Sequence, residues 1–239
     1  MSETKVLTSA DAVARAVAEK LVARIAAVQA EGRVPSIVLT GGTIANEIYR
    51  AVATLPSADL DWMGVDFWWG DERYVAADST DRNDRAAELD LLDVVGADPA
   101  RVHAMPASDE AHPDVATAAA SYVDLLRMHA DGPFDLVLLG VGPDGHVASL
   151  FPGFPQLEIT DEPAVAVTGS PKPPPQRITL TFPALNRTHE VWFLVTGEEK
   201  ADAVARALAD DGSVRETPAR GITCTNRTWW LDEAAASAL

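Results

Sequence analysis

The stretch FDLVLLGVGPDGHVASLFPG, residues 134–153, joins an apolar run to a glycine-rich segment. The run FDLVLL is typical of a buried β-strand, because it is short and almost wholly apolar. The segment after it has the spacing G-x-G-x-x-G, with Asp144 and His146 on either side of the last glycine. Ligands of parallel sheets bind beyond the carboxyl ends of the strands, so this stretch predicts both a sheet and its binding edge.

The same unit of strand, turn and helix recurs along the chain. Residues 9–31 form one helical stripe of apolar side chains behind a possible N-cap at Ser9. Three more apolar runs precede helical spacing, namely SIVLT (36–40), GVDFWWG (64–70) and VWFLVTG (191–197). A further helix at about 111–130 carries Val115, Ala119, Tyr122 and Leu126 on one face. The pattern predicts an α/β fold: a Rossmann-like, mostly parallel sheet with helices on both faces.

One proline-rich stretch interrupts this rhythm. GSPKPPPQRITLTFPALN, residues 169–186, favours an extended loop followed by the strand RITLTF. Such a stretch could also be a linker between two domains. We expect a single α/β domain over residues 1–239, in which the loop Lys172–Pro175 borders the cleft and places Arg177, with Lys172 nearby.

Composition excludes several classes of function. The 239 residues include 36 acidic and 19 basic ones, so the net charge of −17 repels nucleic acid and anionic membranes. Cys224 is the only cysteine, which rules out a disulfide framework. No signal peptide or apolar run of membrane-spanning length is present, and we expect a cytoplasmic protein. The five histidines lack the spacing of metal ligands, so no metal is expected.

The G-x-G-x-x-G spacing is also part of a dinucleotide-binding fingerprint. That fingerprint needs a long helix after the third glycine, but Pro152 and Pro155 leave room for barely two turns. The acidic residues that follow precede the next apolar run instead of ending it, so none is placed to bind a ribose. Asp144 would also repel the pyrophosphate. The glycines are better explained as a sharp turn that carries Asp144 and His146 into the cleft.

A histidine in such a loop can act as a general acid or base near neutral pH. The alternative is that Asp144 and His146 form a structural or surface pair. Ser149 completes the letters of a Ser-His-Asp triad, but no G-x-S-x-G motif supports a serine nucleophile.

A second glycine-rich turn, LTGGTIANEI, lies between a strand and a helix N-terminus. Gly41, Gly42 and Thr43 would suit a phosphate monoester through free N–H groups, the helix dipole and a hydroxyl. A plain strand-to-helix turn is the alternative. Two cations follow or begin other predicted strands, Arg73 and Arg177, and Lys200 begins a helix after a third. Each alone could be a solvated charge, but together they favour an anion site.

Taken together, GGT, GDERYV, GVGPDGHVASLFPG, RITLTFPALN and TGEEK resemble the 6-phosphogluconolactonase family and, more distantly, the glucosamine-6-phosphate deaminases. The resemblance implies a sugar-phosphate isomerase-type fold without a nucleotide. It implies a carboxylic ester hydrolase that converts 6-phospho-D-glucono-1,5-lactone to 6-phospho-D-gluconate in the oxidative pentose phosphate pathway. No cofactor is implied, the partner is the small sugar-phosphate lactone, and we expect a monomer while leaving a dimer open.

The resemblance also implies roles for individual residues. His146 would be the general base with Asp144 beside it, and Arg73 would face the lactone end of the substrate. The residues implied to bind substrate or its phosphate are Gly41, Gly42, Thr43, Asp71, Asn83, Arg177 and Lys200. Asn83 matches the family pattern, but Arg82 stands where lactonases often have a serine.

The deaminases share several of these motifs, and two positions separate them from this chain. Their DGH motif is usually followed five residues later by a glutamate that assists ring opening, and this chain has Phe151 there. They commonly have tyrosine where this chain has Arg73. Both differences favour the lactonase. An isomerase or deaminase, and a sugar-phosphate sensor without catalysis, remain the competing hypotheses.

Overall fold

The computed structural model describes residues 2–56, 60–130 and 132–239. Its strands are β1 (Ser2–Leu7), β2 (Ser36–Leu39), β3 (Asp66–Trp69), β4 (Asp71–Arg73), β5 (Leu136–Gly140), β6 (Ala164–Val167), β7 (Arg177–Leu180), β8 (Val191–Val195) and β9 (Arg227–Asp232). Its α-helices are α1 (Ala10–Ala30), α2 (Thr43–Thr54), α3 (Asn83–Ala87), α4 (Asp93–Val95), α5 (Val115–His129), α6 (Phe182–Asn186) and α7 (Ala201–Leu208).

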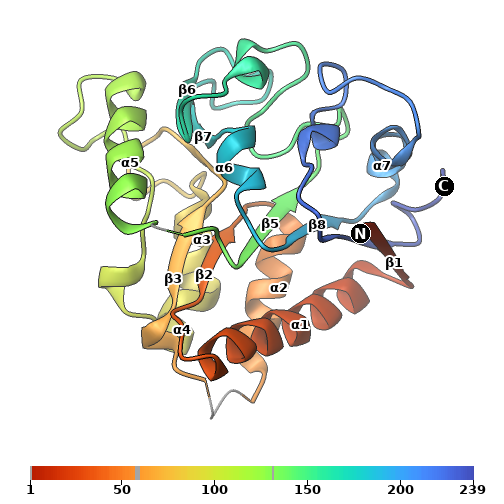
Figure 1. Ribbon diagram of the computed structural model, residues 1–239, viewed down its shortest axis with the longest axis horizontal. Helices are drawn as coiled ribbons and strands as arrows, with labels where there is room; N and C mark the ends of the chain where they lie inside the picture. Colours follow the sequence, from red (N-terminus) through yellow and green to blue (C-terminus); the bar gives the residue numbers. More distant parts are fainter. Residues whose placement is uncertain (1, 57–59, 131) are drawn as a thin grey trace.

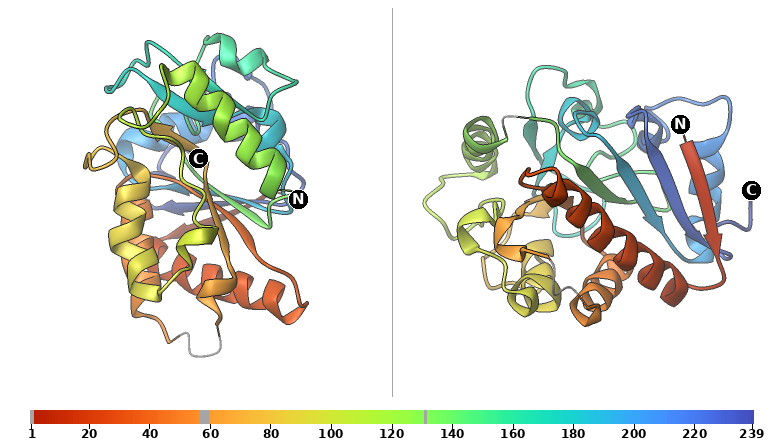
Figure 2. Two further views of the ribbon diagram at one scale, coloured as in Figure 1. Left: turned by 90° about the vertical axis from the view of Figure 1, so that its left-hand side faces the viewer. Right: turned by 60° about the horizontal axis from the view of Figure 1, so that its bottom comes forward.

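Six strands form one parallel sheet in the order β1-β9-β8-β5-β2-β3. Helices α1 and α2 cover one face of this sheet, and α5 lies with the strands β6 and β7 on the other (Figure 1 and Figure 2). The fold is therefore the predicted α/β arrangement, a mostly parallel sheet with helices on both faces.

The strand order reverses direction between β2 and β5. After β2 the chain moves outward to β3, whereas after β5 it moves the other way to β8 and β9. Loops that leave neighbouring strands in opposite directions open a crevice at the carboxyl ends, which is where ligands bind in such sheets. The GGT loop follows β2 and the loop that contains Asp144 and His146 follows β5, so both border this crevice.

A second sheet joins three short antiparallel strands in the order β4-β7-β6. The predicted strand RITLTF is β7, and it belongs to this sheet instead of the parallel one. Its register with β4 pairs Arg73 with Arg177. Two of the predicted cations, 104 positions apart in the chain, thus lie on adjacent strands at the same end of the ladder.

Local sequence signals account for most of the element boundaries. Ser9 caps α1 as predicted, its hydroxyl accepting a hydrogen bond from the N–H of Ala12. The predicted face of α5 is buried. The helical spacing predicted after GVDFWWG does not form one continuous helix, because a π-helical turn (Glu88–Leu92) separates α3 from α4. Periodicity alone does not reveal such a local change of pitch.

A continuous hydrophobic core connects the elements from α1 to β9. The paired tryptophans Trp68, Trp69, Trp229 and Trp230 are buried within it, as expected for packing aromatics. In the part of the chain that the structure describes, no helix combines the length and the apolar composition that a bilayer span requires.

Candidate active site

A cavity of about 370 Å³ opens at the carboxyl ends of β2, β5 and β8. Nine of the ten predicted site residues line it: Gly41, Gly42, Thr43, Asp71, Arg73, Asn83, His146, Arg177 and Lys200. The tenth, Asp144, does not line the cavity but is hydrogen-bonded to His146. Residues that are distant in sequence therefore converge on one cavity.

The turn that carries His146 depends on Gly142. The N–H of Gly142 donates to the carbonyl of His146 across 2.9 Å, which closes the turn. A Cβ on Gly142 would lie 2.1 Å from two atoms of the His146 ring and 2.5 Å from Oδ1 of Asp144. Non-bonded contacts of a Cβ with other heavy atoms are essentially never that short, so this position must be glycine for the imidazole to lie where it does.

Asp144 holds the imidazole from the side away from the cavity. Its Oδ1 lies 2.5 Å from Nδ1 of His146, which leaves Nε2 as the nitrogen that can exchange a proton with a ligand. Partial burial raises the pKa of Asp144, but the hydrogen bond and the charge of His146 outweigh it and lower that pKa to about 2. Asp144 is therefore ionised at neutral pH and able to stabilise an imidazolium.

Phe151 packs against the imidazole of His146. Its ring is fully buried, and its centroid lies 4.7 Å from that of His146. This apolar ring stands where the deaminase pattern would have a carboxylate. The carboxylate that contacts the imidazole is that of Asp144.

The structure of this segment does not have the form of a dinucleotide fingerprint. After Gly145 the chain makes short turns and then one 3₁₀ turn (Pro155–Glu158) instead of a long helix. The letters of a triad do not converge either. The hydroxyl of Ser149 is buried and donates to Oδ2 of Asp71 across 2.5 Å, a group outside the Asp144–His146 pair.

The GGT loop leads directly into α2 and leaves the start of that helix open. Gly42 is the N-cap residue, with φ of 107°, and the first helical turn has neither a side-chain cap nor an acidic residue. Its N–H groups are therefore available to an anion. The buried hydroxyl of Tyr49 fixes the end of β2, because it donates to the carbonyl of Thr40 and accepts from the N–H of Thr40.

Asn83 connects the GGT loop with Arg73. Its Nδ2 donates to the carbonyl of Asp71, and its Oδ1 accepts from Nη1 of Arg73 across 2.7 Å. A Cβ on Gly41 would lie 1.8 Å from the same Oδ1, so the close approach of Asn83 requires glycine there. The buried carboxylate of Glu72 accepts the N–H groups of Asn83 and two other residues, and this holds the segment in place.

The charges at the cavity are mostly positive although the chain is strongly acidic. Arg73, Lys172, Arg177 and Lys200 line it, against Asp71 and Glu199. Burial lowers the pKa of Lys200, and the charge of Lys172 lowers it further. Two ammonium groups that repel each other in a cavity favour the binding of an anion between them.

One feature of the site was predicted from the sequence, and two others were not. The loop Lys172–Pro175 borders the cavity as expected, and Lys172 itself lines it. The buried contact between Ser149 and Asp71, and the role of Glu72, were missed. No short motif signals them, because each contact joins residues on different elements.

Known proteins resemble this chain in sequence and in fold. The family model described as glucosamine-6-phosphate isomerases/6-phosphogluconolactonase matches residues 8–230. The 6-phosphogluconolactonase of Streptomyces coelicolor is 48% identical over 237 residues, which is 95% of this chain and 90% of the relative. That of Mycobacterium tuberculosis is 41% identical over 245 residues, 100% of this chain and 98% of the relative.

Solved structures have the same fold. The structure of 6-phosphogluconolactonase from Trypanosoma brucei superimposes with a TM-score of 0.83 at 29% identity, covering 100% of this chain and 99% of that one. The family model spans almost the whole chain, and the relatives above exceed 40% identity at nearly full length. The chain therefore belongs to the family of glucosamine-6-phosphate isomerases and 6-phosphogluconolactonases.

Proposed function

We propose that this chain hydrolyses 6-phospho-D-glucono-1,5-lactone to 6-phospho-D-gluconate, a reaction of the oxidative pentose phosphate pathway. The observation that carries the proposal is one cavity that combines an imidazole held by a carboxylate with an open helix N-terminus and several cations. The two relatives compared above are 6-phosphogluconolactonases, which supports the same activity.

His146 is the general base in this proposal. Its neutral Nε2 takes a proton from a water molecule as the water oxygen attacks C1 of the lactone. Asp144 stabilises the imidazolium that results, through the hydrogen bond to Nδ1. Arg73 or a backbone N–H offsets the negative charge on the tetrahedral oxyanion. His146 then returns the proton to the ring oxygen as the bond between C1 and that oxygen breaks.

The GGT loop and the cations that line the cavity hold the phosphate in this proposal. Gly41, Gly42 and Thr43 offer backbone N–H groups and a hydroxyl, and Lys200 adds a positive charge. Arg177, which begins β7, lines the same cavity. Binding energy from the phosphate, which does not react, orients C1 toward the attacking water.

The reaction as proposed uses neither a metal nor a cofactor. The charged groups around the cavity are mostly cations, which repel a divalent metal ion, and Asp71 is engaged by Ser149. Activity that persists at full rate in excess chelator is the expected result. Loss of activity in chelator, restored by a divalent cation, would contradict this part of the proposal.

Two assays on the purified protein test the function. Release of acid from freshly made 6-phosphogluconolactone, well above the spontaneous rate, is expected. Release of ammonia from glucosamine 6-phosphate is not, because Phe151 stands where the deaminase pattern has a glutamate. Ammonia release without acid release would replace the lactonase by a deaminase, and neither activity would favour a sensor.

We also propose that residues 1–239 act as one domain, in the cytoplasm and as a monomer. The continuous core from α1 to β9 supports a single domain. A single thermal unfolding transition and a monomer mass in sedimentation are expected. Two separate transitions would contradict the single domain.

A further inference from the structure

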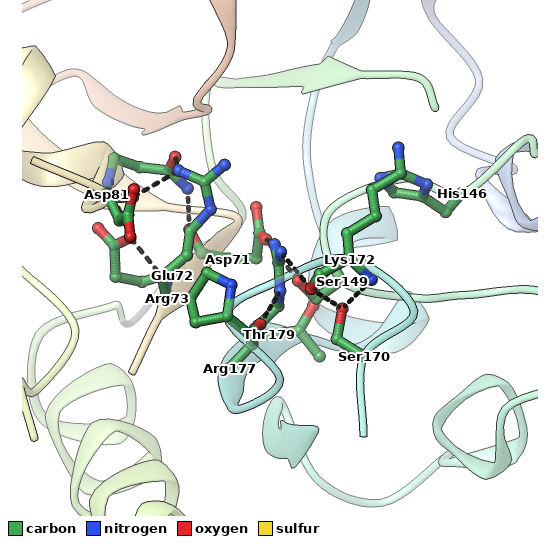
Figure 3. A network of polar contacts seen from close by, with 12 residues as sticks. Asp71, Glu72, Arg73, Asp81, His146, Ser149, Ser170, Lys172, Arg177 and Thr179 are labelled. Carbon is green, nitrogen blue, oxygen red and sulfur yellow. Dashed lines mark hydrogen bonds and ion pairs between the residues drawn. The ribbon is translucent and has the colours of Figure 1, made fainter. Parts of the chain in front are cut away.

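The guanidinium of Arg177 is directed mainly at its own chain. Its Nη2 donates to the carbonyls of Lys172 and Pro173 across 3.1 and 3.2 Å, and its Nε lies 3.3 Å from the carbonyl of Pro174. Three successive carbonyls of one loop thus face one planar group, as Figure 3 shows in part. This leaves Nη1 as the only terminal nitrogen not engaged by the loop, and it lies 3.8 Å from Oδ2 of Asp71.

Buried residues on neighbouring elements also hold the Arg177 side chain in place. Asp71 accepts the short hydrogen bond from the hydroxyl of Ser149. The N–H of Ser149 donates to Oγ1 of Thr179, on the strand that carries Arg177. All four residues are at least nine-tenths buried. Arg177 and Asp71 thus form a buried ion pair at 3.8 Å, and each is hydrogen-bonded to other groups, Arg177 to the loop carbonyls and Asp71 to Ser149. Moving either side chain would leave a buried charge without a partner, which holds the arrangement in place.

The loop that Arg177 holds brings a different cation to the cavity. Lys172 lines the cavity, and its side chain extends from the loop in the direction of His146 (Figure 3). Its charge affects both Asp144 and Lys200, so its ammonium lies within electrostatic reach of each. Ser170 gives the loop a second attachment, its hydroxyl donating to the carbonyl of Lys172 across 2.8 Å.

We propose that Arg177 is a positioning residue that acts through the loop 170–175, and that the ammonium of Lys172 is the group this loop presents to the substrate phosphate. The inference rests on the proposed function for the identity of the anion. Arg177 contributes because its planar set of donors matches three carbonyls at once, and its charge at the cavity is secondary.

Arginine and lysine differ in the property that matters here. Arg177→Lys keeps the positive charge but cannot donate from a rigid plane to three carbonyls. If the charge of Arg177 held the phosphate directly, this substitution would be mild. If Arg177 positions the loop, Arg177→Lys weakens anion binding because the loop no longer holds the Lys172 ammonium at the cavity.

A double-mutant cycle measures this, with the dissociation constant for inorganic phosphate from calorimetry as the readout. Lys172→Met is expected to weaken binding about tenfold, the loss of one charge-assisted hydrogen bond. Arg177→Lys is also expected to weaken phosphate binding in the parent chain. In the Lys172→Met background, Arg177→Lys should change it by less than about twofold. The proposal would be overturned if the two substitutions raised the dissociation constant by factors that multiply in the double variant. It would also be overturned if neither substitution changed the dissociation constant.

Folding is checked in the same samples. Arg227→Lys is the matched control, because Arg227 also donates to a carbonyl but lies at the opposite end of the parallel sheet. Its phosphate affinity should equal that of the parent. If Arg177→Lys does not fold, Ser170→Ala replaces it in the cycle, since it loosens the same loop without touching the core. A Ser170→Ala effect that persists unchanged in the Lys172→Met background would overturn the proposal.

The proposed function and this inference fail in different ways. Acid release by the parent enzyme tests the function, whereas the phosphate cycle requires no turnover. A parent that lacks acid release but follows the cycle leaves the inference standing alone. If the parent releases acid strongly but the effects of the two substitutions on phosphate binding multiply, the proposed function stands and the positioning role of Arg177 does not.

Discussion

Gly142→Ala is the substitution that tests the geometry of the candidate site most directly. It adds one methyl group and removes no functional group. Gly142 is not among the glycines with positive φ, so alanine can adopt its backbone conformation. The effect of the substitution therefore comes from the space that the methyl group occupies.

The size of the effect follows from the distances. The new Cβ would lie 2.1 Å from the His146 ring, and ordinary contact begins at 3.4 Å, so ring or loop must move by more than about 1 Å. Asp144 lies 2.5 Å from the same point and has to move as well. A misplacement of about 1 Å in a catalytic group can cost about 10²-fold in rate. We expect kcat to fall about 100-fold, with a much smaller change in KM, because the new methyl group clashes with His146 and Asp144 and not with the groups proposed to bind the phosphate.

The assay is acid release from freshly prepared lactone over a range of concentrations, with thermal unfolding measured on the same protein. Gly132→Ala is the control, because a Cβ there meets nothing within 4 Å and Gly132 does not have a positive φ. A Gly142→Ala enzyme with kcat within twofold of the parent would refute the reasoning. It would mean that the position of His146 does not limit the reaction.

Other substitutions separate the roles of the remaining groups. His146→Ala should lower kcat by about 10² to 10⁴-fold with little change in KM, and a full kcat would remove its assignment as the base. Because the pKa of Asp144 is about 2, its carboxylate stays ionised across the assay range, and kcat at saturating substrate should fall on the acidic side with the slope of a single proton; a slope of two would contradict this. Lys200→Met should raise KM about tenfold. The lowered pKa of Lys200 means that its charge, and with it phosphate binding, is lost earlier than usual as pH rises, so the alkaline rise in KM should flatten in Lys200→Arg; an unchanged rise would show that another group titrates. Ser149→Ala should keep kcat within about tenfold and lower the free energy of unfolding by about 1 kcal/mol through the lost bond to Asp71, whereas a loss near 10⁴-fold would point to a nucleophile.

The sequence predicted the central strands and the long helices because their signals are local. Burial on both faces makes β2, β5 and β8 apolar almost throughout, and an apolar stripe behind Ser9 sets α1. The π-turn after α3 and the placement of β7 in a separate sheet were not predictable in the same way. Both depend on packing against other elements, which leaves no short pattern in the chain.

The candidate site was likewise predictable only in those parts that local motifs specify. From the sequence alone come the residues whose chemistry is readable in motifs: the histidine after Asp144, the glycine-rich turn before α2, and the cations at strand ends. That they meet in one cavity follows from the parallel strand order, since all carboxyl ends lie at one edge.

Only the tertiary structure decided how those groups are held and which of them face a ligand. Gly142 is required by a clash that spans four residues, and the pairing of β4 with β7 brings Arg73 and Arg177 together. The direction of a guanidinium, toward loop carbonyls or toward a ligand, depends on three-dimensional distances. The sequence by itself determined the chemistry available to this protein and the order of its elements. Folding determined which groups act and which hold them, because close packing and hydrogen bonding join positions that are remote in the chain.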